Sequence, residues 1–195
     1  MRMDESSEIL KKYNSLYLEI IMKYKEYIEE QENLYVAELP KLVTPEDGSV
    51  KAIAGSIASK FQEYDYEENF PDAAQLAYEY VRDSIAGVTL PIQFWLRPSQ
   101  TISYGAGDIF DKSVLLCSLL IALGNPSTKV IIAVSDSRRS FAVYSEFGGK
   151  IIAIDMEKGI NRYDTKEILL KSLGISEEGE ATAYEFNDRM YIDVL

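Results

Sequence analysis

The chain contains no histidine, so none of its 195 residues supplies an imidazole as a catalytic base. It has one cysteine, Cys117, and a single thiol excludes both an internal disulfide framework and a cysteine-based zinc site. One cysteine also fits a reducing compartment, so we expect a cytoplasmic protein with no cofactor. The two residue types that most often carry acyl-transfer chemistry are therefore almost missing.

Basic residues are also few. Twenty Lys and Arg against 32 Asp and Glu give a net charge of −12. This charge repels nucleic acid and anionic lipid over most of the surface, so we expect neither as a partner. No apolar run reaches the roughly 18 residues of a membrane helix, and Met1–Glu8 is too polar and acidic for a secretory signal. With 47% hydrophobic and 27% charged residues, the composition is that of a globular protein.

A helical pattern without proline or glycine runs from Asp4 to about Leu39. Along one face of this helix, which we call the seam, residues recur at alternating spacings of three and four positions: Leu10, Tyr13, Tyr17, Ile20, Tyr24, Tyr27, Gln31 and Leu34. This spacing predicts a long amphipathic helix, which we assign to a segment over residues 1–42. The main interpretation is a helix that packs on its own domain, and the alternative is a homo-oligomer that forms through this helix.

The rest of the chain, residues 43–195, is predicted to form one α+β domain. Helices are expected at 49–63, at 73–85 after the start signal Pro71, and at 109–123 and 164–173. Strands are expected at 129–135, 140–146 and 150–155, followed by a C-terminal hairpin over 181–195. Because helices come first and strands later, with short links, the sheet should be antiparallel.

The stretch from Trp95 to Leu123 has the layout of a functional site. An approach segment leads to a turn broken by Gly105 and Gly107, and an apolar helix then begins. Asp108 is a good N-cap for this helix, and Asp111 is placed to bond back to the cap amide. The following residues are apolar nearly all round, which predicts a buried central helix.

Two segments carry a family resemblance. PSQTISYGAGDIFDKSVLLCSLLIALG resembles the core signature of the transglutaminase-like, papain-type cysteine enzymes, in which a GDC-x-DKA/S-type sequence places the nucleophilic cysteine at the start of a buried helix. SFAVYSEFGGKIIAID resembles the strands that bear the catalytic histidine and aspartate. The resemblance covers roughly Ala73–Asp155. It implies a central helix packed on an antiparallel sheet, with triad positions at Ile109, Ser140 and Asp155.

Two of these three positions depart from the family. Isoleucine has no nucleophilic atom, and serine accepts no proton near neutral pH, so only Asp155 keeps its residue type. Cys117 lies eight residues into the helix among leucines, where we expect a buried structural thiol. The resemblance and these departures predict a degraded, catalytically inactive member, not an enzyme, whose groove binds a protein or peptide. The groove candidates are Trp95, Tyr104, Asp108, Asp111, Arg138 and Arg139.

Two other functions stay open. The first is a structural protein organised by oligomerisation of the N-terminal helix. The second is a hydrolase in which Asp108, Asp111 and Asp155 converge on a metal ion, since hard cations prefer carboxylate oxygens. The simpler interpretation of these residues is two helix caps and one strand-end aspartate, and we expect no metal.

Overall fold

The computed structural model describes residues 2–31, 36–89, 91–92, 94–135, 138–175 and 182–194. The chain divides into two compact units. The first consists of Met1–Leu34 and Thr89–Trp95, and the second of Tyr35–Val88 and Leu96–Leu195. Among the described residues, no helix is both long and apolar enough to span a bilayer.

The first unit contains helices α1 (Arg2–Lys23) and α2 (Lys25–Gln31). The single long helix predicted here is divided at Tyr24, although the Ile28 amide still donates to the Tyr24 carbonyl at 3.0 Å. Its predicted extension to Leu39 is wrong. The 3-10 helix η1 (Val36–Leu42), in the second unit, occupies this region and contains Pro40, which has no amide hydrogen to continue an α-helix. The predicted seam residue Leu34 lies outside the described residues.

In the described part of the second unit, five segments are α-helices: α3 (Gly48–Ala58), α4 (Tyr66–Ser84), α5 (Pro98–Tyr104), α6 (Ile109–Ala122) and α7 (Lys166–Ser172). The predicted helix over 49–63 is shorter than expected, and α5 was not predicted. The helices expected at 109–123 and 164–173 are confirmed as α6 and α7.

Helix α4 begins earlier than predicted, so Pro71 lies inside it and not at its start. Asp65 caps the helix, because its carboxylate accepts the Glu68 amide at 3.1 Å. The Tyr66 ring then packs 5.3 Å from Phe70 and 5.5 Å from Phe147. Aromatic packing against a distant strand therefore stabilises a first turn that is acidic in sequence.

Within the described ranges, six strands form the main sheet, in the order β6-β5-β4-β3-β7-β8, and every adjacent pair is antiparallel. Their bounds are β3 (Lys129–Ser135), β4 (Arg138–Phe147), β5 (Lys150–Asp155), β6 (Gly159–Tyr163), β7 (Thr182–Phe186) and β8 (Tyr191–Asp193). The three predicted strands and the hairpin are confirmed, and β6 was missed. Two short strands, β1 (Ala86–Gly87) and β2 (Ala106–Gly107), pair in parallel. The fold class is α+β, as predicted.

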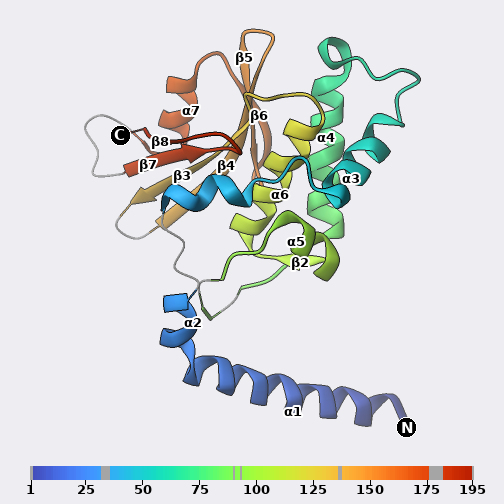
Figure 1. Ribbon diagram of the computed structural model, residues 1–195, viewed down its shortest axis with the longest axis vertical. Coiled ribbons are helices and arrows are strands. Elements are labelled where there is room, and N and C mark those ends of the chain that lie inside the picture. Colours follow the sequence, from blue (N-terminus) through green and yellow to red (C-terminus); the bar gives the residue numbers. More distant parts are fainter. Residues whose placement is uncertain are drawn as a thin grey trace. The chain divides into compact units, whose positions relative to one another are not determined.

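Helix α6 is the centre of the second unit. It lies between the sheet and helices α3 and α4 (Figure 1). Residues Val114–Leu120 are at most 1% exposed, which confirms the predicted buried helix. Helix α7 contributes Leu169 to a second hydrophobic cluster with side chains of β3, β4, β5 and β7. The sheet thus has an apolar layer of its own beside α7.

Candidate functional site

The site begins with the N-terminus of α6, where Asp108 and Asp111 form a reciprocal capping box. The Asp111 amide donates to the Asp108 carboxylate at 2.8 Å, and the Asp108 amide donates to the Asp111 carboxylate at 3.0 Å. A second oxygen of Asp111 accepts the Leu96 amide at 2.8 Å, which ties the approach segment to the helix. A Cβ atom at Gly107 would lie 2.9 Å from the Asp111 Cβ, so only glycine fits there.

The Asp111 carboxyl group is an internal structural element. Its residue is 1% exposed, and burial raises its pKa to about 7, although the two backbone donors oppose this shift. Both oxygens accept backbone hydrogen bonds inside the helix start. Asp111 therefore holds the frame of the site and does not face a ligand.

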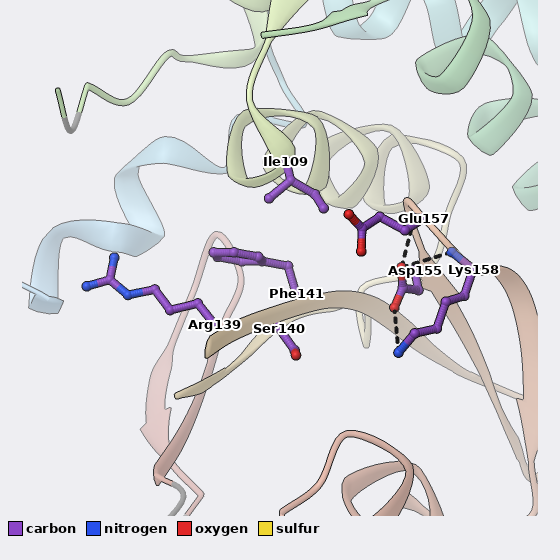
Figure 2. Close-up of a pocket in the computed structure, with 7 residues that line it drawn as sticks. All are labelled: Ile109, Arg139, Ser140, Phe141, Asp155, Glu157 and Lys158. Carbon is purple, nitrogen blue, oxygen red and sulfur yellow. Dashed lines mark hydrogen bonds and ion pairs between the residues drawn. The ribbon is translucent and has the colours of Figure 1, made fainter. Parts of the chain in front are cut away.

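A pocket of about 170 Å³ opens beside the first residue of α6. The residues that line it come from α6, β4, β5 and the turn before β6: Ile109, Arg139, Ser140, Phe141, Asp155, Glu157 and Lys158. Figure 2 shows Ile109 and Phe141 between Arg139 on one side and the group of Asp155, Glu157 and Lys158 on the other. The structure thus brings Ile109, Ser140 and Asp155 together around one hollow.

Asp155 organises the turn that forms one wall of the pocket. Its carboxylate accepts the backbone amides of Glu157 and Lys158 at 2.8 and 3.1 Å, and the Lys158 ammonium lies 3.5 Å from its other oxygen. Asp155 also pairs in register with Gly159 at the start of β6. The strand-end aspartate therefore fixes the β5–β6 hairpin and presents Glu157 and Lys158 to the pocket.

Comparison with known proteins relates this architecture to solved structures. No protein-family profile and no curated protein matches the sequence. Calcium-bound LapG from Legionella pneumophila is similar, with 16% identity, a TM-score of 0.53, and coverage of 83% of this chain and 88% of LapG. EGTA-treated LapG gives 15% identity, a TM-score of 0.53, and coverage of 83% and 87%. LapG has a transglutaminase-like cysteine protease fold.

The chain has the transglutaminase-like fold. This agrees with the resemblance in the sequence, and the central helix packed on an antiparallel sheet is confirmed. At such identities the likeness concerns the fold alone.

One expectation about activity has to be corrected. The missing thiol and imidazole predicted a chain that is not an enzyme. The transglutaminase-like fold is shared with LapG, whose fold is that of a cysteine protease, so the comparison points to an enzyme and contradicts this expectation. The missing thiol at Ile109 and the missing imidazole at Ser140 exclude one mechanism, and they do not by themselves exclude every enzymatic activity.

Of the six groove candidates, the pocket contains Arg139. Asp108 and Asp111 serve the helix cap, and Tyr104 is 68% exposed at the end of α5. Trp95 belongs to the first unit, and the side chain of Arg138 lies outside the described part of the structure. Sequence reasoning missed Phe141, Glu157 and Lys158. Glu157 and Lys158 could have been found, because Asp155 and Gly159 bracket them before a short alternating segment, and this pattern predicts a hairpin turn.

The metal alternative is wrong for the residues that the structure describes. Asp108, Asp111 and Asp155 do not converge, and no group of three His, Cys, Asp or Glu residues in the described ranges is arranged to hold a metal ion. Asp111 is buried with both oxygens directed at backbone amides, and Asp155 is directed at the amides of the β5–β6 turn. Cys117 is fully buried, and burial raises the pKa of its thiol, as expected of a structural cysteine.

Proposed function

We propose that the transglutaminase-like domain recognises an extended protein or peptide segment in the pocket beside Ile109. The observation that carries this proposal is the lining, which combines an apolar centre with the cation Arg139 on one side and the net negative group of Asp155, Glu157 and Lys158 on the other. In the resemblance, Ile109, Ser140 and Asp155 stand at the nucleophile, base and orienting positions. The resemblance thus implies that the pocket corresponds to the place where the family binds a reacting acyl group, which supports the proposal.

The size of the pocket favours one side chain of a longer ligand. Its volume of about 170 Å³ is well below the roughly 300–1,000 Å³ that pockets for drug-sized molecules provide. Ile109 and Phe141 supply apolar contact, and Phe141 also packs edge-on against Phe110 at 6.1 Å, which holds its ring in place. An apolar ligand side chain fits between these two residues.

The charged walls suggest which residues flank that side chain. Arg139 is exposed and offers a fork of donors to a carboxylate. The opposite side carries the carboxylates of Asp155 and Glu157 beside one ammonium group, that of Lys158, so its net charge is negative and suits a cation. We therefore propose a ligand with an apolar residue between one acidic and one basic residue. Such rim charges set orientation and partner choice more than they set affinity.

Fluorescence anisotropy of the full chain with labelled peptide pools tests this function. Two pools carry the patterns Asp-x-Leu-x-Lys and Lys-x-Leu-x-Asp, which cover both chain directions, and a third pool carries Ser-x-Leu-x-Ser. We expect saturable binding of one charged pool, several-fold tighter than that of the serine pool.

Arg139→Glu should weaken this binding several-fold. Lys60→Glu is the matched control, because it makes the same charge change at an exposed position outside the pocket. Equal affinity for all three pools, or equal effects of the two substitutions, would refute the proposed pocket.

A further inference from the structure

The helices of the first unit leave a row of large apolar and aromatic side chains in water. Among the side chains that the structure describes from residue 10 to residue 29, nine are large, apolar or aromatic and 46–64% exposed: Leu10, Tyr13, Leu16, Tyr17, Leu18, Ile20, Met22, Tyr24 and Tyr27. Every residue from Leu10 to Ile20 is exposed. We define the seam face as Leu10, Tyr13, Leu16, Tyr17, Ile20, Tyr24 and Tyr27.

A helix in this state needs a partner. Most helical stability in proteins comes from packing of an amphipathic face, and α1 leaves such a face in water. Six of the seven seam residues keep a spacing of three and four residues, and Leu16 widens the face beside Tyr17. The rings of Tyr13 and Tyr17 stack at 6.3 Å. The face is therefore continuous along α1 from Leu10 to Ile20, where a second helix can cover it. Tyr24 and Tyr27 carry it across the division between α1 and α2, where the Ile28 amide still donates to the Tyr24 carbonyl.

We propose that the seam face pairs with the same face of a second copy of the chain. Each seam side chain exposes roughly 100 Å², because large side chains offer about 150–250 Å² and about half of that is exposed here. Seven such residues give roughly 700 Å² per helix, so two copies would hide roughly 1,400 Å². Specific stable interfaces bury about 1,200–2,000 Å² in total, so a two-fold pair of these helices is sufficient.

Charge and residue type favour a second copy over a lipid surface. Residues 2–31 carry seven acidic and five basic side chains, in a chain of net charge −12. Helices that lie on membranes are instead rich in lysine and arginine on their polar face. Tyrosine is enriched at protein interfaces, and it holds four of the seven seam positions. This proposal does not depend on the peptide pocket.

Sedimentation of the full chain over a wide concentration range tests the pairing. Ile20→Glu places a charge in the seam face, and Tyr17→Ala removes a seam ring while it raises helix propensity, so the helix itself is preserved. Ser15→Glu is the matched control, because it adds the same charge on the other side of α1.

We expect the wild type and Ser15→Glu to sediment at twice the chain mass of 22.1 kDa. Ile20→Glu should be a monomer, and Tyr17→Ala should raise the dimer dissociation constant at least tenfold. A wild-type monomer at all concentrations would overturn the proposal. Hydrogen exchange would then show whether the seam face packs on its own domain, and phosphatidylcholine vesicles would show whether it binds lipid; either result counts against pairing. A dimer that both seam variants leave unchanged would also overturn it.

Discussion

Replacing Asp111 by alanine should destabilise the fold by roughly 2–4 kcal/mol. The carboxyl group accepts the amides of Leu96 and Asp108 at 2.8 and 3.0 Å, at a position that is 1% exposed. Each buried donor left without a partner costs about 1–3 kcal/mol. Removal of a buried carboxyl group offsets part of this loss, because its desolvation penalty also disappears.

Urea unfolding of the full chain, followed by circular dichroism, measures this effect. Asp108→Ala is the control, because it removes one cap acceptor and should cost only about 1 kcal/mol. A smaller loss for Asp111→Ala than for Asp108→Ala would refute the account of the helix start.

Asp111 should also make the stability of the fold depend on pH. Its pKa of about 7 in the folded state exceeds the ordinary aspartate value of 3.8, so between these values the folded chain holds a proton that the unfolded chain releases. The free energy of unfolding of the wild type should therefore fall, relative to Asp111→Asn, as the pH rises from about 4 to about 7. A constant or rising difference would contradict the assigned pKa.

Three further substitutions test other parts of the structure. Ile109→Cys should create one thiol that a maleimide modifies rapidly at neutral pH, whereas Cys117 of the wild type stays unmodified because it is fully buried with a raised pKa; rapid modification of the wild type would contradict this. Glu185→Ala should cost about 3–5 kcal/mol in urea unfolding, because the buried carboxylate accepts the Tyr144 hydroxyl at 2.6 Å and pairs with Lys166 at 2.7 Å and Lys129 at 3.3 Å. The exposed Lys150–Asp164 pair is its control, and Lys150→Ala should change stability by less than about 1 kcal/mol. Gly107→Ala should cost about 1–3 kcal/mol through its clash with Asp111, whereas Gly55→Ala, in an open position of α3, should be neutral or stabilising; equal effects would argue against the tight approach at Gly107.

Local signals in the sequence predicted much of this fold. Asp108 and Asp111 bracket the start of α6 with residues that bond to nearby amides, so the capping box followed from spacing alone. The strands from Lys129 to Asp155 have the composition and length of short antiparallel strands. Both kinds of element depend on residues that are close along the chain.

The features that the sequence did not predict depend on contacts between residues that are far apart in the chain. The first turn of α4 is acidic and precedes Pro71, and it is stabilised by packing of Tyr66 against Phe147, 81 residues later in the numbering. Phe141 and Glu157 enter the pocket only through the register of β4 and β5 and through the turn that Asp155 closes. Tertiary packing decided these features, so local propensity could not reveal them.

The central claim is that a peptide binds beside Ile109, and amide chemical shifts test it most directly. The isotopically labelled full chain is titrated with the Asp-x-Leu-x-Lys and Lys-x-Leu-x-Asp pools, and shifts are compared between two hollows. We predict saturable shifts at Ile109, Phe141 and Lys158, and none at the hollow lined by Tyr66 and Phe147. Shifts confined to the second hollow, or no saturable shift with either pool, would contradict the claim.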